Sequence, residues 1–510
     1  MKHFGFIISI IIGCIFAFPA IAQDAPQPKR EFRGAWLHTV FQDQYLKQST
    51  EQNKAYLTAQ LDSLERAGVN AILWQVRPCA DAFYKSNLEP WSRFLTDGGK
   101  APSPYWDPLQ FMIDECHKRG MELHAWLNPY RVTATKNHNN SLPEGHVYHR
   151  EKDRFVIYDG DGKLYFDPGL PENRKFITDV VMDIIKNYDV DAIHFDDYFY
   201  PYPAAGKDFP DDKSYAKYGD GMNRGDWRRH NVDLLIEEIH DAISSGPKPW
   251  VRFGISPFGI WRNKKSDPRG SDTNGLENYD SLYADVLLWA DKGWIDYLLP
   301  QLYWTLENER ASSLKLIYWW AKAVSGPCQL YIGQDVVRTM KTPDLAPSKL
   351  SSQLNHKVNL TRTIEGVDGN CWWPGYEVSK NTLGVLDSLS TSLMSHKALV
   401  PAYPALSDEA PERPGSIRYS DGVLSWTAPG QNGRASDAVK FVVYRFDFDG
   451  EPDIDNAEAI VAVTNDNKYI VTRPGIYMVT SLSRTNIESD ADVAIYAGAD
   501  PDKVIAPSKK

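Results

Sequence analysis

Cysteine is scarce in this sequence of 510 residues, and acidic residues outnumber basic ones. The five cysteines lie far apart, without a CxxC pair or a Cys/His cluster, so no zinc site is expected. The net charge is -11 and the basic residues form no stripe, which argues against nucleic acid as a partner. The cysteines after residue 22 are predicted to be buried free thiols: Cys79, Cys116, Cys328 and Cys371.

A long apolar run occurs only in the first residues, over 4–18. It follows the basic start Lys2-His3 and precedes Ala20-Ile21-Ala22, a small-x-small cleavage site. This pattern predicts a signal peptide over 1–22, and hence a protein that is secreted, periplasmic or at the cell surface. Association with the cell envelope is compatible with this prediction. Lipidation at Cys14, within a lipobox-like IIGC, is the alternative. No membrane span is predicted elsewhere.

Three common catalytic signatures are also missing. The sequence contains no GxSxG elbow, no HExxH helix and no glycine-rich phosphate loop. Each of these motifs serves a different chemistry, namely acyl transfer by serine, hydrolysis at zinc, and phosphate binding. We therefore predict no cofactor and no bound metal.

Up to about residue 400, short apolar segments alternate with helical patterns such as 54–67, 108–119 and 175–188. Eight strands that alternate with helices predict a (β/α)8 TIM barrel over 30–397. A doubly wound open sheet would carry a GxGxxG turn after its first strand, where this sequence has TVFQDQY. The expected strands are 33–38, 71–77, 122–128, 192–196, 252–256, 297–303, 329–333 and 369–373.

The pattern changes near residue 400. The segment PAYPALSDEAPERPGS is rich in proline and acidic residues, and it predicts a linker over 398–412. Short alternating strands without a helix then predict a small all-β, immunoglobulin-like sandwich over 413–510. LSWTAP, FVVYRF and GIYMVTSLSR resemble a fibronectin type III module, with Trp426 and Tyr444 in its core. We assign no chemistry to this module.

The segment DAIHFDDYFYPYP, at 191–203, ends an apolar strand on two adjacent carboxylates. The active site of a (β/α)8 barrel lies at the C-terminal ends of its strands. Side chains alternate along a strand, so Asp196 is predicted to face the barrel mouth with His194, while Asp197 points away and supports it. Alternatively, the pair caps the next segment or binds a structural cation.

Polar and aromatic residues also end the other predicted strands. Carboxylates beside such rings suit glycoside hydrolysis, in which one carboxylate attacks or stabilises the cationic sugar and an acid protonates the leaving oxygen. Aromatic rings offer flat faces on which sugar rings stack. A polysaccharide or glycan is therefore the predicted substrate. The residues predicted to bind it are His38, Arg77, Asn128, Tyr130, His194, Gln301, Tyr303, Trp304 and Trp372.

Six motifs carry a family resemblance: FRGAWLHTV, QVRPCADAFYKSNLEPWS, HAWLNPYR, DAIHFDDYFYP, GISPFGIWRN and IDYLLPQLYW. In this order they resemble the bacterial glycosyl-hydrolase-like family ten. The resemblance implies a (β/α)8 glycoside hydrolase of the cell envelope that acts on cell-wall glycan. The family is distantly similar to α-amylase-like barrels. Their nucleophilic aspartate on strand four matches Asp196, and their substrate-binding asparagine on strand three matches Asn128.

Those related barrels carry their acid, a glutamate, on strand five, where this sequence has Ser256. The proton donor is therefore open among Asp81, Glu307 and Asp335. Asp81 lies within the motif RPCADAFY and is assigned as catalytic together with the Asp196-Asp197 pair.

The sequence thus predicts an exported glycoside hydrolase that cleaves a bacterial polysaccharide, with peptidoglycan-type glycan as the expected substrate. Two alternatives remain. One is a non-catalytic carbohydrate-binding barrel of the cell envelope, which the missing strand-five acid favours. The other is a metal-dependent polysaccharide deacetylase. It would need a histidine-rich metal set, and only isolated histidines such as His38, His124 and His194 occur near strand ends.

Overall fold

A computed structural model describes residues 25–136, 142–343, 352–491 and 493–498. The predicted signal peptide and Cys14 lie outside the described residues. Eight parallel strands close into a barrel in the order β1-β10-β9-β8-β7-β6-β3-β2. They are β1 (Phe32–Leu37), β2 (Ala71–Arg77), β3 (Glu122–Leu127), β6 (Ala192–Phe195), β7 (Arg252–Ile255), β8 (Tyr297–Leu298), β9 (Gln329–Asp335) and β10 (Gly369–Trp373). The predicted (β/α)8 barrel is confirmed.

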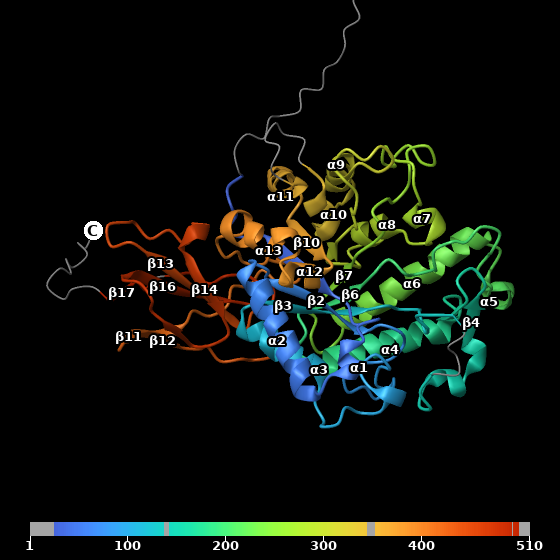
Figure 1. The fold of residues 1–510 in the computed structure, drawn as a ribbon, viewed down its shortest axis with the longest axis horizontal. Coiled ribbons are helices and arrows are strands. Elements are labelled where there is room, and N and C mark those ends of the chain that lie inside the picture. The colour runs from blue at the N-terminus through green and yellow to red at the C-terminus, as the bar shows by residue number, and fades with distance from the viewer. Residues whose placement is uncertain (1–24, 137–141, 344–351, 492, 499–510) are drawn as a thin grey trace, which may run out of the picture.

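Helices surround the barrel (Figure 1). Local signals fix their starts: Ser49 forms a capping box with Gln52 before α2, and Asp107 caps α3 ahead of Pro108. The helices of this domain are α1 (Gln44–Lys47), α2 (Thr50–Arg66), α3 (Pro108–Lys118), α4 (Pro171–Asn187), α5 (Asp212–Tyr218), α6 (Arg224–Ser244), α7 (Asn278–Ser281), α8 (Val286–Asp291), α9 (Ser313–Ala323), α10 (Val336–Lys341), α11 (Gln353–Thr363), α12 (Gly375–Ser379) and α13 (Val385–Ser388).

Aromatic and polar side chains fill the barrel interior. Alternation along each strand sends Phe32 and Trp36 of β1 inward, together with Trp126 of β3 and Tyr297 of β8. Large side chains from several strands thus meet on the axis and leave a packed core rather than a pore.

A hairpin not expected from the sequence follows β3. Its strands are β4 (Phe155–Tyr158) and β5 (Lys163–Phe166), which pair antiparallel. Tyr165 also bridges to Arg131, just past the end of β3. The hairpin therefore lies over the C-terminal side of the barrel, next to the strand ends.

The C-terminal module consists of two antiparallel sheets. Its interior contains Trp426, Phe441 and Tyr477, and the Tyr477 hydroxyl donates to the Arg473 carbonyl at 2.7 Å. One sheet has the strand order β11 (Gly415–Ser420), β12 (Val423–Thr427), β15 (Lys468–Ile470). The other sheet has the strand order β14 (Ile460–Thr464), β13 (Lys440–Phe446), β16 (Gly475–Leu482), β17 (Ile495–Ala497). The two-sheet architecture agrees with the predicted all-β module, whereas its fibronectin type III assignment stays a prediction.

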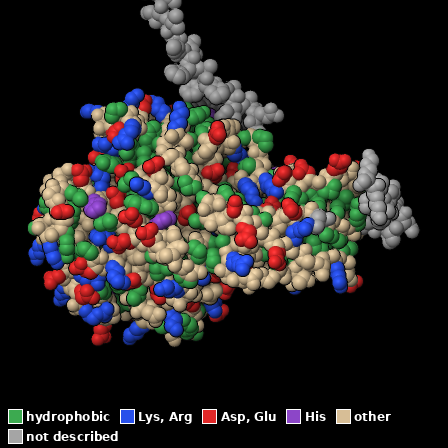
Figure 2. Space-filling view, turned by 180° about the vertical axis from the view of Figure 1, so that it is seen from behind, with side chains coloured by type: hydrophobic (Ala, Val, Ile, Leu, Met, Phe, Trp, Pro, Cys, Tyr) green, Lys and Arg blue, Asp and Glu red, His purple; other side chains and the backbone are tan. Residues whose placement is uncertain are grey.

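The first part of the expected linker is buried. Leu399 pairs with the segment before β1 through hydrogen bonds to Lys29 and Glu31, and its side chain packs into the module. Val400 and Tyr403 are 5% and 3% exposed, and Val400 joins the cluster that fills the barrel. This stretch therefore connects the two domains as packed structure. The module forms a lobe beside the barrel, and basic side chains are dispersed among acidic ones on the face that Figure 2 shows.

Candidate active site

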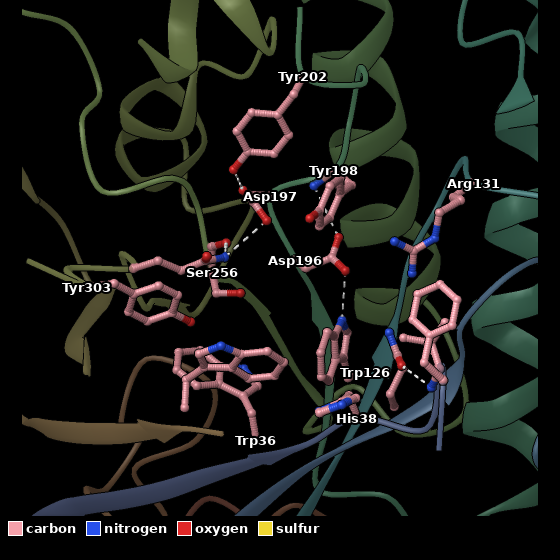
Figure 3. A pocket seen from close by; sticks show the side chains of 15 residues that line it. Trp36, His38, Trp126, Arg131, Asp196, Asp197, Tyr198, Tyr202, Ser256 and Tyr303 are labelled. Carbon is pink, nitrogen blue, oxygen red and sulfur yellow. Dashed lines mark hydrogen bonds between the residues drawn. The ribbon is translucent and has the colours of Figure 1, made fainter. Parts of the chain in front are cut away.

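A cavity of about 330 Å³ opens at the C-terminal ends of the barrel strands. Seven strands or their immediate extensions supply side chains to it, because the inward positions at these ends converge on the axis. It is lined by Trp36, His38, Val40, Phe41, Gln75, Trp126, Arg131, Asp196, Asp197, Tyr198, Tyr202, Ser256, Gln301, Tyr303 and Trp373. Figure 3 shows the carboxylates of Asp196 and Asp197 at its centre.

Asp196 is surrounded by hydrogen-bond donors. Its Oδ2 accepts from the indole N–H of Trp126 at 3.0 Å, and its Oδ1 from the amide N–H of Tyr198 at 3.1 Å. The Asn128 side chain donates to both oxygens, at 3.1 and 3.2 Å. Burial raises the pKa of Asp196, while the Arg131 charge and these donors oppose that rise. Arg131 and these donors therefore stabilise the ionised form of Asp196 against the effect of burial.

Asp197 also lines the cavity, which differs from the predicted alternation. Strand β6 ends at Phe195, so the chain turns before Asp197 and the two-residue alternation no longer applies. Its Oδ1 accepts from Gln301 Nε2 at 3.1 Å, and its Oδ2 accepts from the Tyr202 hydroxyl. Burial, reinforced by the Asp196 charge, raises the pKa of Asp197 to about 6. The two neighbouring carboxyl groups thus differ in their hydrogen-bond donors and in the charges around them.

Aromatic rings form the cavity wall below the carboxylates (Figure 3). Trp373 meets Trp36 and Trp126 edge to face, with ring centroids 6.4 and 6.1 Å apart. Tyr303 stands at 90° to Trp36. Such a wall offers flat apolar faces together with N–H and O–H groups, which suits the faces and hydroxyls of a sugar.

Three predicted substrate-binding residues line the cavity: His38, Gln301 and Tyr303. His38 lies 2.6 Å from Gln42 Nε2, and burial lowers its pKa to about 4, so its ring is neutral at ordinary pH. Gln301 contacts Asp197 directly. These side chains are placed to bind or orient a ligand beside the carboxylates.

Other predicted binding residues lie behind the cavity. Arg77 is fully buried and pairs with Glu89 at 2.6 Å, while its guanidinium also donates to the Asn128 carbonyl. Asn128 reaches the site through Asp196. The remaining four do not line the cavity: Tyr130, His194, Trp304 and Trp372.

The three candidate proton donors named from the sequence all lie outside the cavity lining. Asp81 is buried and pairs with Arg93 at 3.4 Å; burial, opposed by Arg93, raises its pKa to about 6. Glu307 accepts from Gln353 Nε2 at 2.6 Å, and Asp335 caps α10 through the Arg338 amide. Asp197 is therefore the carboxyl group beside Asp196 that has a raised pKa and faces the cavity.

Five cavity residues have no site role predicted from the sequence: Trp36, Trp126, Arg131, Tyr198 and Tyr202. The two tryptophans lie in FRGAWL and HAWL, which read as buried strand interior. Strand alternation could have indicated their inward position, because Trp126 shares its strand face with Glu122 and His124, and Trp36 shares its face with Phe32.

Over the described residues no group of three metal-ligating side chains gathers, and no helix has the length and hydropathy of a membrane span. The four cysteines after residue 22 are buried free thiols.

A closed parallel barrel with paired carboxylates and an aromatic wall at its C-terminal mouth has the layout of a glycoside-hydrolase-type barrel. The chain belongs to the glycosyl hydrolase-like 10 family, whose model matches residues 31–347. The resemblance inferred from the six motifs is thereby confirmed.

Individual relatives extend this match. "Glycosyl hydrolase YngK" of Bacillus subtilis (strain 168) is 39% identical over 453 residues, 86% of this chain and 87% of the relative. "Glycosyl hydrolase DigH" of Escherichia coli (strain K12) is 39% identical over 375 residues, 69% of this chain and 84% of the relative. Among solved structures, the PgaB (BpsB) glycoside hydrolase domain of Bordetella bronchiseptica aligns at 12% identity and a TM-score of 0.48. That alignment covers 71% of this chain and 98% of that domain.

Proposed function

We propose that this protein is an exported glycoside hydrolase that cleaves a bacterial polysaccharide, with peptidoglycan-type cell-wall glycan as its substrate. The observation that carries the proposal is the pair of adjacent carboxyl groups in one cavity with unequal surroundings. Asp196 accepts hydrogen bonds from three residues near Arg131, whereas the pKa of Asp197 is raised to about 6. Two carboxyl groups whose pKa values are separated by their environment are the usual basis of an acid and a charge-stabilising partner.

In the proposed reaction, protonated Asp197 donates its proton to the glycosidic oxygen as the bond from that oxygen to the anomeric carbon breaks. Ionised Asp196 faces the positive charge that develops on the sugar ring and stabilises it or forms a bond to the anomeric carbon. Asp197 then accepts a proton from the water that attacks the anomeric carbon, and any bond between Asp196 and that carbon breaks as the water adds. In this scheme Asp197 replaces Asp81 as the acid, because Asp81 lies outside the cavity lining and pairs with Arg93.

Digestion of purified cell-wall glycan tests the activity. The chain without residues 1–22 is incubated with glycan strands that carry or lack stem peptides, and the products are identified by mass spectrometry. We expect shorter glycans from at least one substrate and none from the Asp196→Asn variant. Glycan that is bound but left intact by the wild-type chain would contradict hydrolysis and support the carbohydrate-binding alternative.

Export is proposed from the pattern in residues 1–22. N-terminal sequencing of the protein recovered from the cell envelope or medium is expected to begin at Gln23. A mature chain that begins at a lipid-modified Cys14 would replace this form with the lipoprotein alternative, and an uncleaved cytosolic chain would contradict export.

A further inference from the structure

A continuous series of hydrogen bonds runs down the barrel axis beneath the cavity. The indole N–H of Trp36 lies 3.2 Å from His194 Nε2, and His194 Nδ1 lies 3.0 Å from the Tyr297 hydroxyl. The same hydroxyl lies 2.8 Å from His124 Nδ1, and His124 Nε2 lies 3.1 Å from Glu122 Oε2. All five side chains are buried. We call Trp36, His194, Tyr297, His124 and Glu122 the axial row.

The chemistry of the donors leaves one protonation pattern for this row. An indole N–H can only donate, so His194 Nε2 accepts from Trp36 and the proton of the neutral ring is on Nδ1. That Nδ1–H donates to the oxygen of Tyr297, whose own proton then points to His124 Nδ1. His124 is left with a proton on Nε2, which it donates to Glu122. Burial lowers the pKa of both imidazoles, which keeps them neutral.

Both domains hold the far end of the row. Glu122 Oε2 pairs with Arg252 Nη1 of the barrel at 2.9 Å. Its Oε1 faces the C-terminal module, 3.5 Å from Lys440 Nζ and 2.8 Å from Asn486 Nδ2. Burial acts to raise the pKa of Glu122, but Arg252 and Lys440 hold it well below its usual range. The module therefore helps to keep a carboxylate at the bottom of the barrel.

The near end of the row reaches the carboxylates of the cavity. His194 Nε2 lies 3.0 Å from the Ser256 hydroxyl, and both Ser256 and Trp36 line the cavity. The Gln301 side chain donates to the Ser256 carbonyl at 3.0 Å and to Asp197 at 3.1 Å. His194 thus holds the hydroxyl of Ser256, and the backbone carbonyl of the same residue accepts from the Gln301 amide that binds Asp197.

From these contacts we propose that His194 is a positioning residue for Asp197, and that the C-terminal module supports this role by contributing Lys440 and Asn486 to the axial row. This proposal rests on the proposed function, because it assigns His194 to the orientation of the acid. The unprotonated Nε2 of His194 binds Trp36 and the Ser256 hydroxyl, and the backbone carbonyl of Ser256 binds Gln301. A shift of about 1 Å in a reacting group can cost about 100-fold in rate, so loss of this support is expected to reduce kcat more than it changes KM.

Substitutions at His194 provide the kinetic test in the full chain without residues 1–22. His194→Gln keeps an acceptor near the position of Nε2, whereas His194→Phe keeps the ring and removes the acceptor. We expect kcat to fall roughly 10- to 100-fold in the Phe variant and to be largely restored in the Gln variant. In the Phe variant we also expect a shift in the pH at which activity is lost as Asp197 deprotonates. Equal kcat values and pH profiles in the wild type and the Phe variant would overturn the positioning role.

The contribution of the module is tested with Lys440→Met. Lys468→Met is the matched control, because Lys468 is an exposed lysine of the same module. We expect Lys440→Met to lower kcat severalfold and to shift the pH at which activity is lost as Asp197 deprotonates. Lys468→Met should keep the wild-type kcat and pH profile. Identical kinetics of the two variants would overturn the support from the module.

Nitrogen-15 NMR of histidine-labelled protein tests the row without any substrate. We expect His194 to be neutral with its proton on Nδ1 between pH 5 and 8, and we identify its signal by its loss in His194→Gln. A proton on Nε2, or titration within this range, would overturn the proposal even if the enzyme is active. The expected tautomer in a chain without hydrolase activity would refute the proposed function and, with it, the positioning role, while leaving the geometry of the row intact.

Discussion

Two adjacent aspartates in this site differ because their donors differ. Asp196 accepts from an indole, an amide side chain and a backbone N–H, and Arg131 lies close enough to favour its charge. Asp197 accepts from Gln301 and Tyr202, both uncharged, and it experiences the repulsion of the Asp196 charge. The sequence places the pair at a strand end, but only the folded surroundings separate their roles.

The pH dependence of catalysis follows from this separation. Asp197 acts as the acid only while protonated, and its pKa is raised from 3.8 to about 6 by burial and the Asp196 charge. We therefore expect kcat/KM to fall as pH rises through about 6, and to rise at low pH as Asp196 ionises. A profile measured from pH 3 to 9 that stays flat between pH 5 and 8 would contradict this assignment.

The same shift has a consequence for stability. Because its pKa is higher in the folded chain, Asp197 contributes stability that is fully present below pH 3.8 and is lost as pH rises through about 6. The Asp197→Asn variant is expected to lack this component, so the difference in melting temperature between variant and wild type should change across this window. A constant difference from pH 3 to 8 would contradict the raised pKa.

At the scale of elements, alternating apolar and helical segments were enough to predict all eight barrel strands. The boundaries were less predictable where tertiary contacts decide them: β8 has only two residues, against an expected seven over 297–303. The inward position of Asp196 followed from strand alternation. That of Asp197 did not, because the chain leaves the strand at Phe195. The hairpin β4–β5 was missed because its short strands lie between two longer elements.

Gly254 in β7 gives room to the axial row. A Cβ at this position would lie 2.0 Å from the ring of Tyr297, so no other residue fits without moving that ring. We expect Gly254→Ala to reduce the free energy of unfolding by about 1–3 kcal/mol through overpacking. It should also lower kcat, because Tyr297 connects His194 to His124.

Gly430→Ala is the control for this substitution, since a Cβ at Gly430 meets nothing within 4 Å. Denaturant unfolding and kinetics of both variants provide the measurement. Equal stability and equal kcat in the two would show that Tyr297 does not need the space at Gly254.

At the scale of the whole molecule, the module is joined to the barrel by specific contacts. Besides Lys440 and Asn486, Arg484 pairs with Asp189 at 2.8 Å and Lys29 pairs with Glu488 at 2.8 Å. Leu399, in the segment expected to be a linker, packs with core residues of the module. The composition of this segment indicated a boundary, but composition does not reveal which side chains become buried on docking.

These contacts predict a difference between two fragments of the module. Residues 411–510 expressed alone are expected to fold into an all-β domain, because both sheets lie within them. Residues 398–510 are expected to melt at a higher temperature, since they restore Leu399 to its cluster. Circular dichroism and thermal unfolding test both statements. A disordered 411–510 fragment, or equal melting temperatures, would contradict this description of the boundary.

The division of labour between Asp196 and Asp197 is tested most directly with two leaving groups. The glycan that the wild-type chain cleaves is compared with an aryl glycoside of the same sugar whose phenolate leaves without protonation. Asp197→Asn should lose about 100- to 10,000-fold on the glycan and recover most of its rate on the aryl glycoside. Asp196→Asn should lose about 1,000-fold or more on both, with folding intact. Near-normal turnover by Asp196→Asn, or an equal loss on both substrates by a well-folded Asp197→Asn, would contradict the account.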